Sequence, residues 1–153
     1  MRLSQGPAIL VSMNKHSEAK IETHQGHCHC GLLRFEVDLD VSQGATRCNC
    51  SVCVRVGATT SQVKPEAFRL LCDEAQLSEY ANAIGARYFC PTCGVHAYGR
   101  GDLPELGGKF VSVNWSCFDD IDLGAVKIGY WDGRHNNWQA GLRSTPWPIF
   151  TAE

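Results

Sequence analysis

Long apolar runs are missing from this chain of 153 residues. No segment approaches the roughly 20 consecutive apolar residues that a helix needs to cross a bilayer, so we expect no membrane partner. An excess of charge of one sign is missing too, because 14 basic and 16 acidic side chains leave a net charge of −2 at pH 7. Since the basic residues are scattered, the sequence predicts no surface for nucleic acid.

The start of the chain lacks the features of a secretion signal. Its short apolar stretch, Ala8 to Val11, is soon followed by charged residues, and no small-residue cleavage site follows it. We therefore expect a cytoplasmic protein. Its length suits one domain, which we expect over residues 22–135. Residues 1–21 are predicted to be a flexible tail, and residues 136–153, which contain two prolines, an extended segment packed on the domain.

Helical periodicity is scarce along the chain. Leu33 to Leu39 alternates apolar and polar residues, and Phe110 to Trp115 is a second strong strand candidate. Shorter strands are expected over Ala58–Val63, Phe68–Cys72 and Val95–Tyr98. Only Asp73 to Asn82 and Asp120 to Ala125 offer a turn or two of helix. The sequence therefore predicts a mainly β fold with little helix.

Cysteine, by contrast, is abundant. The chain has nine cysteines, an odd number, whereas a secreted disulfide framework favours an even number in a shorter chain. In a reducing compartment, clustered cysteines are more often metal ligands or redox groups. Seven of the nine fall into three clusters: Cys28-x-Cys30, Cys48-x-Cys50-x-x-Cys53 and Cys90-x-x-Cys93.

The Cys90-Pro-Thr-Cys93-Gly94 motif is typical of a zinc knuckle. Two intervening residues let both sulfurs reach one tetrahedral ion, and the glycine allows a left-handed turn behind them. The alternative is a redox dithiol, which requires a helix that begins at the first cysteine. The residues after Gly94 alternate like a strand, so we favour zinc.

The Cys28-x-Cys30 pair supplies the thiolates that would complete a four-thiolate structural site with Cys90 and Cys93. Such a site would join the first strand to the middle of the chain across roughly 60 residues, and metal binding would add to stability by linkage. His27 and His29 are then interpreted as turn residues beside the ligands, because four thiolates already close the site.

The Cys48-x-Cys50-x-x-Cys53 cluster offers three thiolates and has no fourth ligand close in sequence. A zinc ion with three protein ligands keeps a position for water or substrate, as catalytic sites do. The alternative is that a distant residue closes the site and makes it structural. The candidates for that role are Cys72, His96, Cys117 and His135. Cys72, in an apolar segment, is better interpreted as a core residue.

Together these motifs resemble the glutathione-dependent formaldehyde-activating enzyme (GFA) family, whose domain is shared with centromere protein V. The matching stretches are Gly26–Gly31, Arg47–Cys53, Tyr88–Gly94, Phe110–Asn114 and Cys117–Asp120. The resemblance covers roughly residues 22 to 135 and all seven clustered cysteines.

The resemblance implies a β-tent fold of small antiparallel sheets and two zinc ions. It implies that Cys28, Cys30, Cys90 and Cys93 hold a structural ion, and that Cys48, Cys50 and Cys53 hold the reactive one. It also implies a carbon–sulfur lyase that joins glutathione and formaldehyde as S-hydroxymethylglutathione. Many members follow the third cysteine with a basic pair and Thr-Gly, whereas this chain has Val54-Arg55-Val56-Gly57. If this segment shapes the pocket, a related thiol or aldehyde is possible.

Three thiolates donate much charge to zinc and weaken its Lewis acidity, which favours binding of a thiol over activation of water. A tripeptide thiol also needs partners for its carboxylates, for which Arg47, Arg55 and Arg100 are candidates, although each is individually more typical of solvated surface charge.

Trp131, Trp138 and Trp147 could line a pocket or a self-association surface, but irregularly spaced aromatics are usually core.

Two other functions remain open at this point. One is a non-catalytic zinc-binding module of the same fold, as centromere protein V relatives illustrate, and a fourth protein ligand at the three-cysteine cluster would support it. The other is a redox or metal-buffering protein, which would have to stay folded without zinc while it cycles between dithiol and disulfide.

Overall fold

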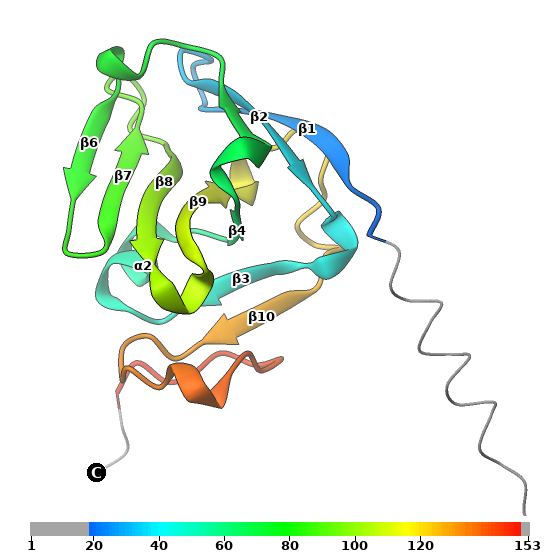
Figure 1. The fold of residues 1–153 in the computed structure, drawn as a ribbon, viewed down its shortest axis with the longest axis vertical. Coiled ribbons are helices and arrows are strands. Elements are labelled where there is room, and N and C mark those ends of the chain that lie inside the picture. Colours follow the sequence, from blue (N-terminus) through cyan, green and yellow to red (C-terminus); the bar gives the residue numbers. More distant parts are fainter. Residues whose placement is uncertain (1–18, 151–153) are drawn as a thin grey trace, which may run out of the picture.

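The computed structural model describes residues 19–150, which form two β-sheets (Figure 1). The smaller sheet has three antiparallel strands in the order β1-β2-β5. Its strands are β1 (Glu22–His27), β2 (Arg34–Leu39) and β5 (Phe68–Leu70). Most of the predicted tail lies outside the described residues, so the expected division at residues 21 and 135 remains a prediction.

The larger sheet has seven strands in the order β10-β3-β4-β9-β8-β7-β6. Its strands are β3 (Ala45–Cys48), β4 (Thr60–Val63), β6 (Ser78–Ala81), β7 (Gly85–Phe89), β8 (His96–Leu103), β9 (Gly108–Asn114) and β10 (Ile128–Trp131). All of its pairs are antiparallel except β10 with β3. That parallel register pairs Tyr130 with Arg47 and Trp131 with Cys48, so it brings aromatic side chains from late in the chain to the three-cysteine cluster.

Helix is limited, among residues 19–150, to one short α-helix and six turns of 3-10 helix. They are α2 (Ser51–Val56), η1 (Val41–Gln43), η2 (Pro65–Ala67), η3 (Glu74–Gln76), η4 (Pro104–Leu106), η5 (Trp115–Cys117) and η6 (Trp138–Ala140). The predicted mainly β fold with little helix is confirmed. Of the two segments expected to offer helix, Asp73–Asn82 holds η3 and then strand β6, and Asp120–Ala125 contains no helix, only turns.

The core lies between the two sheets. Leu33 and, on alternate positions of β2, Phe35 and Val37 are fully buried, as their alternation predicted. The ring of Phe68 in β5 packs at a tilt against that of Tyr98 in β8, with centroids 4.8 Å apart, which joins the small sheet to the large one. Each such side chain contributes about 1.5–3 kcal/mol through burial of its apolar surface. No helix among residues 19–150 is long and apolar enough to cross a membrane.

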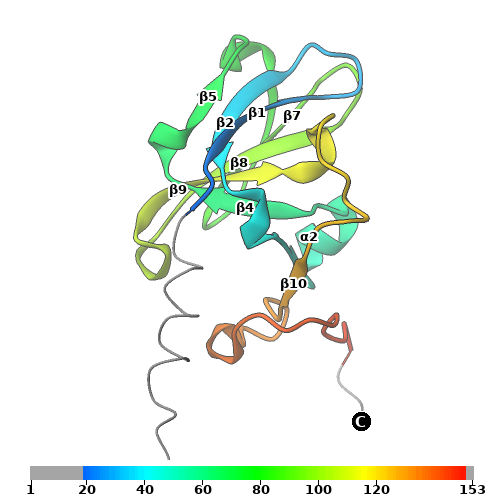
Figure 2. The same cartoon turned by 90° about the vertical axis from the view of Figure 1, so that its right-hand side faces the viewer.

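Residues 134–150 follow β10 and run along the end of the molecule away from the small sheet (Figures 1 and 2). They carry η6 but no strand. An antiparallel bridge between Tyr130 and Arg143 fastens them to β10 through two backbone hydrogen bonds of 2.9 and 3.2 Å. They therefore pack against the edge of the large sheet at which β10 and β3 lie.

Candidate metal centres

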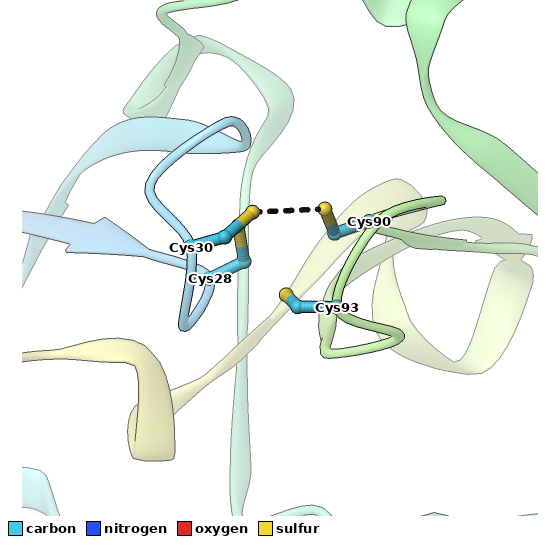
Figure 3. A group of neighbouring side chains, drawn as sticks. All are labelled: Cys28, Cys30, Cys90 and Cys93. Carbon is cyan, nitrogen blue, oxygen red and sulfur yellow. Dashed lines mark hydrogen bonds between the residues drawn. The ribbon is translucent and has the colours of Figure 1, made fainter.

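Four cysteines from two distant loops converge at one point of the structure. Cys28 and Cys30 follow β1, Cys90 and Cys93 follow β7, and the side chains turn toward one another (Figure 3). Their sulfur atoms all lie within 4.8 Å of one another. The Cys28–Cys30 and Cys30–Cys90 sulfur separations are 3.6 and 3.5 Å, close to the roughly 3.8 Å edge of a tetrahedron with zinc–sulfur bonds of 2.3 Å. This four-cysteine cluster could hold a metal ion.

The two loops of the four-cysteine cluster share the same turn, in which a left-handed glycine donates its N–H to the carbonyl of the first cysteine. Gly94 has a φ of 76° and its N–H donates to the Cys90 carbonyl at 2.8 Å, and Gly31 has a φ of 82° and donates to Cys28 at 3.1 Å. Left-handed backbone of this kind favours glycine. The turn after Cys28 also directs the Leu33 N–H at the Cys28 sulfur, 3.3 Å away.

Burial separates two members of this cluster from solvent, whereas Cys30 is exposed and Cys93 is partly exposed. Cys28 and Cys90 are both 0% exposed, and thiolates at such depth need a cation to offset their charge. Cys117 lies nearby, but burial raises the pKa of its thiol to about 12, so it is a neutral core group at neutral pH. His27 and His29 stay outside the four sulfurs; His27 contacts Asp119 at 2.5 Å, and His29 is exposed.

The other three clustered cysteines lie at the junction of β3 and α2. Cys48 ends β3, Cys50 is the N-cap of α2 and Cys53 lies within the helix. Helical geometry brings residues three apart onto one face, so the three sulfurs lie within 4.8 Å of one another. Gly57 ends the helix with a φ of 70°. Unlike the buried pair of the first group, all members of this three-cysteine cluster are partly exposed.

No fourth His, Cys, Asp or Glu joins the three-cysteine cluster among residues 19–150. The four candidate residues lie elsewhere. Cys72 packs against the core, Cys117 lies near the carbonyl of His96, the His96 ring stacks on Phe89, and His135 contacts Asp132 at 2.6 Å. The described part of the chain therefore offers three thiols at this point, and both clusters could hold metal ions.

Arg87 is a neighbour of the three-cysteine cluster that the sequence pattern did not predict. Its Nη2 donates to the Cys53 sulfur at 3.2 Å, from strand β7. A guanidinium at this distance would offset the negative charge of three thiolates that held a metal ion. Its position in the sequence gives no signal, because an arginine on a strand before a knuckle is ordinarily a surface residue.

The three candidate arginines have different surroundings. Arg55 donates to the carbonyl of Ser51 in its own helix at 2.8 Å, and Arg100 pairs with Glu74 at 3.0 Å. Arg47 donates through Nε to Thr59 at 2.8 Å and lines a cavity next to the three-cysteine cluster. Arg47 is therefore the candidate that lies beside the cluster.

That cavity has a volume of about 380 Å³. Its walls include Arg47, Cys48, Cys53, Tyr130, Trp131 and Trp147. Of the three candidate tryptophans, Trp131 and Trp147 thus line the cavity. Trp138 packs on Trp131, with ring centroids 5.9 Å apart, and is about half exposed. The cavity has the size of a small-molecule site and contacts two of the three thiols.

Asn49, between two of these cysteines, anchors the later part of the chain. Its buried Nδ2 donates to Asp132 at 2.7 Å and to the Pro148 carbonyl at 3.0 Å, and its Oδ1 accepts from the backbone of Arg134 at 2.9 Å. Gly133 passes so close to Cys48 that a Cβ there would lie 2.5 Å from the sulfur. Hydrogen bonds and close packing therefore join the three-cysteine cluster to the part of the chain that follows β10.

Asp132 is the acidic member of this network and is 4% exposed. Burial alone would raise the pKa of its carboxyl, but hydrogen bonds from Asn49, His135 and Asn137 outweigh burial and hold that pKa below its usual range. A charged carboxylate at this position keeps the Asn49 amide oriented beside the cluster.

Comparisons with known proteins point to one family. The family model described as glutathione-dependent formaldehyde-activating enzyme (GFA) matches residues 23–133, which include both clusters. A protein of Emericella nidulans named "Putative glutathione-dependent formaldehyde-activating enzyme" is 36% identical over 99 residues, which are 59% of this chain and 50% of that protein. The chain thus spans about half the length of this curated relative.

Among solved structures, the crystal structure of a Rhodobacter sphaeroides protein is similar, with a TM-score of 0.57 and 27% sequence identity. The match covers 68% of this chain and 98% of the other. Since the family model covers well over half of the sequence, the chain belongs to the glutathione-dependent formaldehyde-activating enzyme family.

Proposed function

We propose that the protein is a zinc-dependent carbon–sulfur lyase that joins a thiol such as glutathione to an aldehyde such as formaldehyde, and splits the adduct in the reverse direction. The observation that carries the proposal is a cluster of three thiols, without a fourth ligand among the described residues, that opens on a cavity of about 380 Å³. Membership of the family supports the reaction type.

The donor sets support zinc at both clusters. Cys28, Cys30, Cys90 and Cys93 would form a closed structural site, since four thiolates complete a tetrahedron. Cys48, Cys50 and Cys53 would hold the second ion and serve as the catalytic ligands. Zinc bound there would keep one position for exchange, at which it binds a thiol sulfur or polarises a carbonyl oxygen. Seven reduced thiols also fit a reducing compartment such as the cytoplasm.

The reaction itself is the addition of a thiol to an aldehyde, and side chains of this protein would assist it. The new bond joins the thiol sulfur to the aldehyde carbon, the carbonyl π pair moves to oxygen, and that oxygen gains the proton that the thiol loses. Neither electrons nor protons are consumed. Arg87 would offset negative charge at Cys53, Arg47 offers a guanidinium for a carboxylate, and Tyr130, Trp131 and Trp147 offer aromatic surface for the apolar part of a substrate.

The experiment has to separate catalysis from the rapid uncatalysed addition of thiols to formaldehyde. Exchange between glutathione, formaldehyde and their adduct is measured by NMR magnetisation transfer at equilibrium, with zinc-loaded protein in catalytic amount. We expect exchange above background for the parent chain and for the matched control Cys72→Ala, and background exchange for Cys50→Ala. Exchange at background for all three proteins would reject the proposal and favour the non-catalytic zinc-binding module.

A further inference from the structure

The cavity beside the three-cysteine cluster is walled partly by residues that the family model does not cover. That model ends at residue 133, whereas Trp147 and its neighbours Pro146 and Ile149 line the cavity. Tyr130 and Trp131 of β10 lie beside Arg47 and Cys48 of β3 in the parallel register. The recognition surface of this chain therefore extends beyond the shared family region.

Three contacts hold Trp147 and the residue after it in place. Its indole Nε1 donates to the Tyr130 carbonyl at 3.0 Å, and the Arg143 guanidinium lies 3.8 Å from its ring centroid. The next residue, Pro148, accepts a hydrogen bond from Asn49 at 3.0 Å. An aromatic wall fixed in this way needs little ordering when a ligand binds, which favours a flat apolar partner.

Few charged side chains line the cavity itself. Arg47 is the only basic side chain among the described residues that line it, and none of those residues is acidic. Two further guanidiniums lie beside the cavity, but Arg87 already donates to Cys53, and Arg143 donates to the carbonyls of Thr145 and Pro146. No carboxylate among residues 19–150 forms an ion pair with Arg47. Glutathione carries two carboxylates and an ammonium group at neutral pH, so the cavity offers a charged partner for one of its three charges.

We propose that this cavity binds a thiol or thiol–aldehyde adduct with an apolar ring and a single carboxylate, the ring against Trp147 and the carboxylate at Arg47. The inference rests on the proposed function, because it takes the three-cysteine cluster as the site that meets the sulfur. It differs from the family reaction in the substrate class, since the cavity matches an aromatic monocarboxylate better than a zwitterionic tripeptide.

The test compares four thiols by calorimetric titration of the zinc-loaded full chain. The probe is 2-benzyl-3-sulfanylpropanoic acid, with 3-sulfanylpropanoic acid lacking the ring, 2-benzyl-3-sulfanylpropan-1-ol lacking the carboxylate, and glutathione. We expect the probe to bind about tenfold more tightly than each of the other three, because ring burial and the charged pair each contribute about 1.4 kcal/mol or more.

Two variants and two matched controls assign that preference to residues. Trp147→Leu should remove the preference for the ring, and Arg47→Gln should remove the preference for the carboxylate. Tyr80→Leu changes an exposed aromatic residue of β6 and Arg55→Gln an arginine, both outside the cavity, and both variants should leave the two preferences unchanged. Because Trp147→Leu could loosen residues 134–150, nuclear Overhauser contacts between the probe ring and the Trp147 indole are measured in the parent protein as well.

The outcomes separate this inference from the proposed function. Equal or tighter binding of glutathione, absence of binding by all four thiols, or absence of contact with Trp147 would overturn the inference. Selective binding of the probe without catalysed thiol–aldehyde exchange would support the recognition and reject the lyase. Catalysed exchange of glutathione and formaldehyde with no preference for the probe would support the lyase and reject the recognition.

Discussion

The two cysteine clusters of this chain differ in how far apart their members lie in the sequence and in what surrounds them. The four-cysteine cluster joins loops 60 residues apart, and two of its members, Cys28 and Cys90, are 0% exposed. The three-cysteine cluster comes from one junction, Cys48 to Cys53, and lines a cavity. Ligands drawn from distant loops fasten the fold, whereas ligands from one short segment leave one side free for another molecule.

The surroundings of the two clusters differ in the same way, with a structural setting for one and a polar setting beside a cavity for the other. Around the four-cysteine cluster, Gly31 and Gly94 shape two matching turns and the core packs behind them. Around the three-cysteine cluster, Arg87, Asn49 and Asp132 supply charge and hydrogen bonds from separate elements. Polar support of this kind is costly to bury unless it is satisfied, so its concentration at the smaller cluster supports a functional site there.

The largest effect is expected from Cys90→Ala, which breaks the four-cysteine cluster. Structural zinc contributes about 10–16 kcal/mol to the folding of small zinc domains, which exceeds the roughly 5–15 kcal/mol net stability of a typical domain. The variant should therefore lose cooperative thermal unfolding, as followed by circular dichroism. A variant whose Tm stays near that of the parent would contradict the assignment of this cluster to the fold.

Cys50→Ala tests the role of the three-cysteine cluster in the same way. It should reduce the zinc content from two ions to one, measured by plasma mass spectrometry, and bring thiol–aldehyde exchange to background. Its unfolding should remain cooperative, because the three-cysteine cluster joins only β3 and α2. Loss of cooperative unfolding in this variant would mean that the two clusters do not differ in role.

Arg87→Met removes the guanidinium beside Cys53 and should weaken the second zinc site alone. A hydrogen bond to a charged group is worth about 1.5–3 kcal/mol, so the zinc Kd at the three-cysteine cluster should rise about tenfold or more in a chelator competition. Arg55→Gln, on the helix of the same cluster, serves as the control and should leave it unchanged. Equal affinities in the parent and Arg87→Met would show that the contact has no role there.

The smallest effect concerns pH and Asp132. Since the pKa of this carboxyl is held below its usual range, its contribution is fully present above its unfolded pKa of about 4 and is lost as the pH falls through the folded value. Asp132→Asn should lower the Tm by a few degrees at pH 7. The difference from the parent should shrink as the pH falls below about 4, in thermal scans at several pH values. A difference that does not change with pH would contradict the charged network.

The sequence carried most of the information about the clusters themselves. Thiol ligands have to converge on one ion, so a spacing such as Cys90-x-x-Cys93 by itself indicates the geometry of the ligands. The alternation from Leu33 to Leu39 likewise predicts a strand with one buried face, and β2 has it. Such local signals survive because one constraint acts on neighbouring residues.

Other features could not be read from the sequence, for physical reasons. Helix α2 carries three valines, which favour strands, but the three thiols gather only if Cys50 and Cys53 lie on one helical face. The sequence offered Trp147 only as one of three candidate tryptophans and gave no indication of Arg87. Both reach the site through tertiary pairing, Trp147 through the bridge to β10 and Arg87 through the position of β7. Their roles depend on partners that are distant in sequence, and single residues give no periodic signal.

The most direct test of the central claim is a crystal structure of the zinc-loaded protein with a bound thiol, with both ions located by anomalous scattering. We predict zinc–sulfur bonds of about 2.3 Å from Cys28, Cys30, Cys90 and Cys93 at one ion. At the other ion we predict three bonds from Cys48, Cys50 and Cys53, with the sulfur of the added thiol in the fourth position. A fourth protein ligand at the second ion would contradict the account.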